Sequence, residues 1–173
     1  PGRYGERILV GATSNVNDAP DIRDASMEHI INTPKMHCAP ITGNIADLLE
    51  VSDDNTVFTI RLRKGLKWSD GHPVTTEDVR FAYEDVLLNE KITPVIYQAY
   101  LEGGLSYAPP LGLEILDERT FRVSSSTPYG GFLVYLGVGQ RWGGYYTLIR
   151  PKHYLQQFHL KYTSLDQMRP LLD

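Results

Sequence analysis

Cysteine is almost missing from this chain of 173 residues, which contains a single one, Cys38. An internal disulfide is therefore excluded, and so is a metal site built from several cysteines. Positive charge is not in excess either, because 17 Lys and Arg stand against 21 Asp and Glu, for a formal net charge of -4. Nucleic acids and anionic membrane surfaces attract clustered positive charge, so the composition predicts neither as a partner.

Long apolar runs are also absent, and no stretch approaches the roughly 20 residues that a membrane-spanning helix needs. The sequence opens at Pro1 without an initiating Met or a signal peptide, which is typical of a mature or trimmed start. Its 42% hydrophobic and 22% charged residues are ordinary proportions for a globular domain with a packed core.

Motifs for catalysis and for phosphate binding are missing as well. No Walker loop, G-x-G-x-x-G run or G-x-S-x-G elbow occurs. Neighbouring carboxylates such as Asp53-Asp54 and Glu77-Asp78 suit turns and helix starts, whereas a catalytic pair must converge across a cleft. The histidines include no pair four residues apart and no H-E-x-x-H motif, so no metal site is expected. They are His29, His37, His72, His153 and His159. The sequence predicts neither an enzyme nor a cofactor.

A strand is the clearest element that the sequence does contain. "TVFTIRLR", from Thr56 to Arg63, alternates apolar and polar residues and places Phe58, Ile60 and Leu62 on one face. A bend is expected at Gly65, and "SDGHP" after it reads as a tight turn. "LEILDERTFRVSS", residues 113–125, predicts two further strands joined by an Asp-Glu turn.

Helices are predicted between these strands and after them. In "TTEDVRFAYEDVLLN", Thr75 can cap a helix while Asp78, three residues later, completes a capping box. A second helix is expected just after Pro151, and an earlier one over residues 21–32. With an apolar strand predicted over residues 6–13, the chain is expected to be mixed α/β with short strands.

One long stretch carries a family resemblance. "IADLLEVSDDNTVFTIRLRKGLKWSDGHPVTTEDVRFAYEDVL", residues 45–87, resembles the signature region of the family 5 extracellular solute-binding proteins, the peptide- and nickel-type receptors of ABC importers. "ILVGAT", "LEILDERTFRVSSSTPYGGFL" and "LIRPKHYLQQF" resemble further family segments in the family's order. The matching positions are Val51 to Asp54, Phe58 to Arg63, Gly65, Lys67 to Gly71, Pro73, Thr75 and Glu77 to Val79.

The resemblance implies an α/β (mixed α+β) fold of the periplasmic-binding-protein-like type II kind, with part of lobe I and its small subdomain. Residues 1–44 are expected to form a strand and helix of lobe I, 45–148 the small α+β subdomain, and 149–173 a return into lobe I. Because family members are much longer and have a second lobe, the chain is expected to be an N-terminal fragment.

The implied function is capture of an extracellular solute for a bacterial or archaeal ABC permease, with an oligopeptide as the leading ligand. The alternatives are an oligosaccharide, or a free-standing structural fragment without ligand binding. The expected location is the periplasm or cell surface, with membrane association only through a lipid anchor upstream of Pro1. The expected ligand contacts are Thr13, Ser14, Asn15, Val16, Tyr97 and Trp142, with a core-packing role as the alternative for Tyr97 and Trp142.

Overall fold

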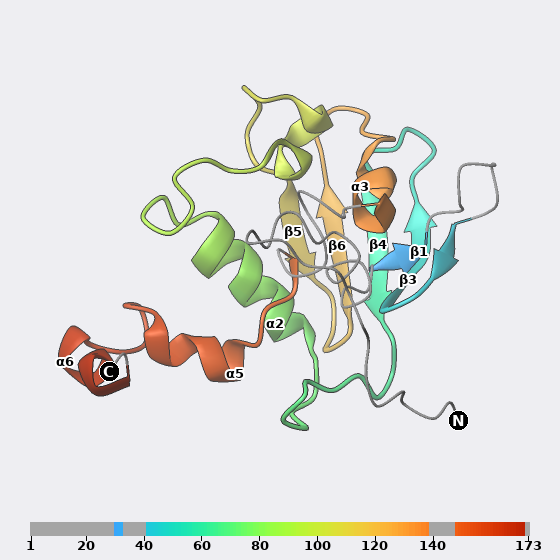
Figure 1. Cartoon of the computed structure of the whole chain (residues 1–173). Helices are drawn as coiled ribbons and strands as arrows, with labels where there is room; N and C mark the ends of the chain where they lie inside the picture. The colour runs from blue at the N-terminus through green and yellow to red at the C-terminus, as the bar shows by residue number, and fades with distance from the viewer. Residues whose placement is uncertain (1–29, 33–40, 139–147, 172–173) are drawn as a thin grey trace, which may run out of the picture.

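The computed structural model describes residues 30–32, 41–138 and 148–171, and its centre is a four-stranded antiparallel sheet in the order β3-β4-β6-β5 (Figure 1). β5 and β6 are joined by the tight turn predicted for Asp117-Glu118. β3 pairs with β4 and carries an irregularity between Leu48 and Glu50 that shifts the register. The strands are β3 (Ala46–Val51), β4 (Val57–Leu62), β5 (Gly112–Ile115) and β6 (Thr120–Ser124).

The sheet has one apolar face and one polar face, as the alternation in β4 predicts. Phe58, Ile60 and Leu62 are completely buried. Across the ladder, Phe58 is paired with Val123 and Ile60 with Phe121, so the neighbouring strand presents apolar residues on the same face. Ion pairs mark the other face, such as Arg122 with Glu114 at 2.8 Å. Among the described residues, the apolar side chains of the sheet therefore gather on one of its faces.

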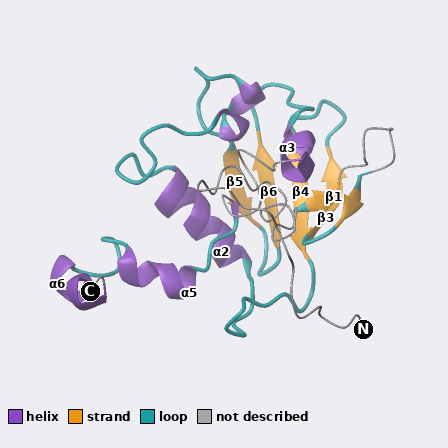
Figure 2. Cartoon of the chain, in the orientation of Figure 1, coloured by secondary structure: helices purple, strands orange, loops and turns teal. Residues whose placement is uncertain are grey.

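The principal helix begins where the sequence predicts. α2 (Thr76–Arg80) is preceded by Thr75, whose capping box with Asp78 is present. The helix continues as a wider π-helical segment, η2 (Phe81–Leu87). Val79 and Tyr83 are buried in the same core as the sheet. A third helix, α3 (Phe132–Val138), sets the Phe132 ring 5.0 Å from that of Phe58. Figure 2 shows these helices beside the sheet strands.

A small two-stranded ladder and several short helices complete the described chain. β1 (Ile31–Asn32) pairs with β2 (Thr42–Gly43), and Ile30 before it forms a bend, so the helix predicted over residues 21–32 is wrong at its last three positions. Positions 21–29 lie outside the described residues. Ile31 is β-branched and fully buried, which favours a strand. None of the described helices is long and apolar enough to cross a membrane. The short helices are η3 (Gln98–Tyr100), η4 (Glu102–Gly104), α5 (Lys152–Leu155), η5 (Gln156–Phe158), α6 (Leu165–Met168) and η6 (Arg169–Leu171).

The C-terminal segment, residues 151–171, contains α5 and α6. Pro151 stands immediately before α5, as predicted. Figure 1 shows α5 and α6 on the outer side of α2, farther from the sheet than α2 is. The segment therefore touches the rest of the molecule mainly through the principal helix and the turn before it.

The turn before α2 belongs to the signature stretch, residues 45–87, and its backbone conformation requires glycine. Gly65 and Gly71 adopt φ values of 80° and 90°, and a bridge between Lys67 and Pro73 closes a narrow hairpin around "SDGH". The predicted bend at Gly65 is thus confirmed. Because L-residues with a Cβ are disfavoured at positive φ, both glycines are required by backbone conformation.

Replacing Gly71 with alanine is expected to lower the free energy of unfolding by about 1–2 kcal/mol, because the left-handed conformation becomes strained. No heavy atom lies within 4 Å of the added Cβ, so the loss would come from the backbone alone. Gly130 is the matched control, because its Cβ would also meet open space and its φ is not positive. Urea unfolding should therefore show a loss for Gly71→Ala and none for Gly130→Ala; equal effects would contradict this account.

Candidate functional site

Of the predicted ligand contacts, the structure describes Tyr97 alone. Thr13, Ser14, Asn15, Val16 and Trp142 lie outside the described residues. Tyr97 stands just before η3 with extended backbone angles and is half-buried against the hydrophobic core. Tyr97 therefore packs against the core, the alternative considered for it, and the residue also remains partly exposed.

Tyr97 belongs to a chain of aromatic rings that runs into the core. Its ring meets Tyr135 of α3 edge-on, with centroids 6.1 Å apart and an interplanar angle of 87°. Tyr135 lies 6.4 Å from Tyr129, which lies 5.8 Å from Phe132. Burial raises the pKa of the Tyr97 hydroxyl, with a further contribution from Tyr135. Aromatic pairs favour this edge-to-face arrangement, so the contact with Tyr135 helps to hold the Tyr97 ring in one orientation.

The signature stretch is organised around one carboxylate, Asp78, which is 4% exposed. Its Oδ2 accepts hydrogen bonds from Trp68 Nε1 at 3.1 Å and from the backbone N–H of Thr75 at 3.0 Å. Its Oδ1 accepts one from the backbone N–H of Lys152 at 2.9 Å. Asp78 therefore ties the hairpin, the start of α2 and the C-terminal segment together. These contacts give the signature stretch a structural role.

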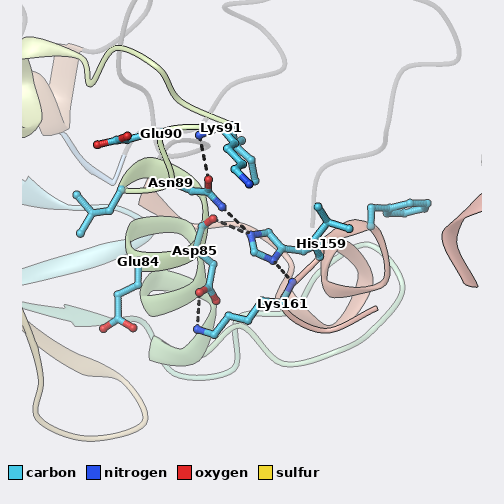
Figure 3. A pocket seen from close by; sticks show the side chains of 11 residues that line it. Glu84, Asp85, Asn89, Glu90, Lys91, His159 and Lys161 are labelled. Atoms are coloured by element: carbon cyan, nitrogen blue, oxygen red, sulfur yellow. Dashed lines mark hydrogen bonds and ion pairs between the residues drawn. The ribbon is translucent and has the colours of Figure 1, made fainter. Parts of the chain in front are cut away.

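A second contact between the principal helix and the C-terminal segment lies at the end of η2. A cavity of about 810 Å³ lies between the end of η2 and the segment after η5 (Figure 3). In its wall, Asp85 accepts hydrogen bonds from Lys161 Nζ at 2.6 Å and from the Tyr162 hydroxyl at 2.5 Å. The lining residues are Glu84, Asp85, Leu88, Asn89, Glu90, Lys91, Ile92, Phe158, His159, Leu160 and Lys161.

His159 occupies the wall of this cavity in one tautomer. The backbone N–H of Lys161 donates to Nδ1 at 3.1 Å, so Nε2 carries the ring proton and donates to the Asp85 carbonyl at 2.8 Å (Figure 3). With 7% exposure and both ring nitrogens engaged, His159 is a packing residue. Asp85, His159 and Lys161 in the cavity wall are therefore engaged with one another, and the cavity lies where two parts of the chain meet.

Asp85 makes this junction sensitive to acid. Burial by itself raises the pKa of Asp85, but the hydrogen bonds from Lys161 and Tyr162 outweigh burial and leave the pKa below its ordinary value of 3.8. A carboxyl whose pKa is lowered in the folded state adds stability above the ordinary pKa and loses it as the pH falls through the lowered one.

The variant Asp85→Asn is accordingly expected to cost about 1 kcal/mol of unfolding free energy near neutral pH. The gap between the original protein and Asp85→Asn should close as the pH falls below 3.8. Urea unfolding along a pH series measures both quantities, with the exposed Asp166→Asn as a control expected to change little. A gap that stays constant down to the acid limit would contradict the assignment.

Two histidines come together in a way that sequence spacing did not indicate. His72 is exposed in its turn, and its ring stacks on that of His153 from α5 with centroids 4.1 Å apart. His153 Nε2 lies 2.6 Å from Asp70 Oδ2, and this hydrogen bond lowers the pKa of the Asp70 carboxyl. The contact joins residues 83 positions apart, a separation for which local motifs give no signal.

Comparison with known proteins identifies the family. Residues 40–142 match the family described as "Bacterial extracellular solute-binding proteins, family 5 Middle". The match includes the sheet, α2, Tyr97 and α3, and it extends over more than half of the sequence. The chain belongs to the family 5 bacterial extracellular solute-binding proteins.

Individual relatives agree with this assignment. The periplasmic oligopeptide-binding protein OppA of Salmonella typhimurium is 37% identical over 86 residues, covering 43% of this chain and 16% of the relative. A periplasmic alpha-galactoside-binding protein of Rhizobium meliloti is 38% identical over 52 residues, covering 30% of this chain and 8% of the relative. A solved structure of an oligopeptide-binding protein OppA superposes with a TM-score of 0.73 at 32% identity, covering 90% of this chain and 22% of that one.

The superposition confirms the predicted fold class, because it extends over most of the chain at substantial sequence identity. The chain spans about a fifth or less of the length of these relatives, from 8% to 22%. It therefore corresponds to one part of the relatives' structure.

Proposed function

We propose that this chain is part of the substrate-binding component of an ABC importer, a receptor that captures an oligopeptide outside the cytoplasmic membrane and delivers it to the permease. The observation that carries the proposal is the 32% identical OppA structure, which matches 90% of this chain with a TM-score of 0.73. The OppA relative from Salmonella typhimurium, which is also named for oligopeptide binding, supports the same ligand class.

In this proposal Tyr97 supplies an aromatic surface for the ligand. Its ring is held edge-on by Tyr135 and is half-buried, so little side-chain freedom remains to be lost on binding. Thr13, Ser14, Asn15, Val16 and Trp142 are proposed as further contacts. A tyrosine held in this way can stack on a peptide backbone and donate a hydrogen bond through its hydroxyl.

The remaining features of the receptor are proposed on the same basis. Residues 1–44 and 149–173 belong to lobe I, and residues 45–148 form the small subdomain. The protein acts by binding, without catalysis and without a cofactor. It works in the periplasm or at the cell surface, with a lipid anchor upstream of Pro1 as its proposed attachment to the membrane.

One other ligand class has specific support. The alpha-galactoside-binding relative is 38% identical over its matched residues, and aromatic surfaces suit sugar rings as well as peptides. An oligosaccharide is therefore the second candidate. A structural fragment without ligand binding is the third, and it differs from the others in that no solute should stabilise it.

The test is calorimetric titration of the chain with synthetic tri- and tetrapeptides and with an alpha-galactoside trisaccharide, followed by thermal unfolding with each ligand. Peptides are expected to bind and to raise the melting temperature. Tyr97→Ala should weaken peptide affinity by about 2- to 10-fold, the share expected of one aromatic contact.

Tyr107 provides the matched control, because this tyrosine is 84% exposed. Tyr107→Ala should leave affinity unchanged. Binding of the trisaccharide alone would favour the oligosaccharide receptor. Absence of any ligand-induced stabilisation would support the structural fragment and overturn the proposal.

A further inference from the structure

The turn of the signature stretch and the first helix of the C-terminal segment share a cluster of metal-binding side chains. Among the described residues, Asp70, His72 and His153 form the one group of three His, Cys, Asp or Glu side chains whose ligand atoms all lie within 4.8 Å of one another. Two imidazole nitrogens and one carboxylate oxygen are a donor set that suits Zn²⁺ and neighbouring divalent ions of the first transition row.

The turn positions two of the three donors. Gly71, at φ 90°, bends the chain so that Asp70 and His72 project from the same hairpin tip. The backbone N–H of His72 donates to Asp70 Oδ1 at 3.1 Å, which occupies one carboxylate oxygen in the turn. The other oxygen, Oδ2, lies 3.5 Å from His72 Nδ1. One oxygen thus builds the turn while the other is directed at an imidazole.

The third donor, His153, is held in position by contacts with the start of α2. Asp78 accepts the backbone N–H of Lys152 at 2.9 Å, and Glu77 binds Lys152 Nζ at 2.8 Å. Lys152 is therefore held at both its backbone and its side chain, and His153 follows it directly. His153 Nε2 lies 2.6 Å from Asp70 Oδ2, the oxygen that also faces His72.

We propose that Asp70, His72 and His153 bind a divalent transition-metal ion, for which Zn²⁺ is the probe, and that the ion fastens the signature hairpin to α5. Ligand atoms around a tetrahedral zinc stand about 3.3 Å apart, given bonds of about 2.0–2.1 Å. The 3.5 Å between Asp70 Oδ2 and His72 Nδ1 is already close to that spacing. The 2.6 Å between Asp70 Oδ2 and His153 Nε2 would widen as the ion replaces their hydrogen bond, and the 47% exposed Asp70 side chain can shift by that amount without disturbing the core. Solvent supplies the remaining coordination position.

The proposed site is open to solvent, and one of its ligands is already fixed in position. His153 is 24% exposed at its side chain and Asp70 is 47% exposed, so an ion can enter from solvent while one ligand is already held in place. A bound ion would join positions 70 and 153 across the intervening chain, and it would stabilise the folded state because the unfolded chain has no preformed site.

The experiment is isothermal titration of the untagged, chelator-treated chain with ZnCl₂, together with thermal unfolding and Co²⁺ absorption spectra. We expect one ion per chain, a higher melting temperature with Zn²⁺, and the visible bands of tetrahedral cobalt. Asp70→Asn keeps the oxygen that accepts the His72 N–H but loses the carboxylate charge. His72→Gln removes an exposed ligand. Each should weaken binding at least as much as the roughly 10- to 100-fold loss known for outer partners of metal sites.

Asp117→Asn is the matched control, because Asp117 also accepts backbone N–H groups in a turn, from Arg119 at 2.7 Å and from Thr120 at 2.9 Å. This variant should bind Zn²⁺ as the original does. Histidine NMR signals should shift for His72 and His153 alone. The proposal is overturned if no ion binds, or if Zn²⁺ binds equally well to Asp70→Asn and His72→Gln, since the ion then lies elsewhere. Circular dichroism of both variants separates loss of the site from loss of the fold.

Discussion

Phe58→Ala is expected to lower the free energy of unfolding by about 3–5 kcal/mol, which is a large fraction of the total for an ordinary domain. The ring is fully buried at the centre of the apolar face of β4. It packs 5.0 Å from Phe132 of α3, so alanine would leave a cavity between the sheet and a helix. Chemical denaturation followed by tryptophan fluorescence measures the change.

Val57→Ala is the control for this prediction. Val57 is the preceding residue on the same strand and projects from the opposite face, where it is half-buried. Truncation there is expected to cost about 1 kcal/mol. Should the two variants lose similar stability, the assignment of the core to a single face of the sheet would be wrong.

Asp78→Ala is expected to destabilise the protein by about 3 kcal/mol, because the capping box is lost and three N–H donors are left without their acceptor. The backbone N–H of Thr75 and the Trp68 indole N–H both lose the acceptor Oδ2. The backbone N–H of Lys152 loses its partner as well. Hydrogen exchange should therefore accelerate at Lys152 in addition to the helix start.

Glu77→Gln is the matched control, because Glu77 is the neighbouring acid on the same turn but 46% exposed at its side chain. Its ion pairs with Lys152 and Arg80 lie at the surface, where such pairs contribute roughly 0–1 kcal/mol. Equal destabilisation by Asp78→Ala and Glu77→Gln would indicate that charge near the helix start matters more than the three hydrogen bonds that Asp78 accepts.

The sequence predicts the local elements of this protein well, because their causes are local. Alternation in residues 56–63 reflects the two faces of a strand, and the capping box of Thr75 and Asp78 needs residues only three positions apart. The long family signature also led directly to the correct fold class. Where the prediction failed, at Ile31 and Asn32, the residues pair with Thr42 and Gly43, a tertiary contact that helical spacing does not report.

The sequence predicts the sites less well, because they are assembled by contacts between distant residues. Tyr97 was singled out from the family resemblance, but its orientation depends on Tyr135 of α3. His72 and His153 gave no metal motif because they meet through the folding of the C-terminal segment back onto the hairpin. Lys161 reaches Asp85 across 76 positions for the same reason. Spacing rules apply within one helix or strand and do not predict contacts between residues that are far apart in the sequence.

The hydrogen bond between Asp78 and Lys152 also closes a long loop. The two residues are 74 positions apart, and strands β5 and β6 lie within the loop between them. Because contacts of long sequence separation must overcome the entropy of closing a long loop, we expect docking of the C-terminal segment to be a late step in folding.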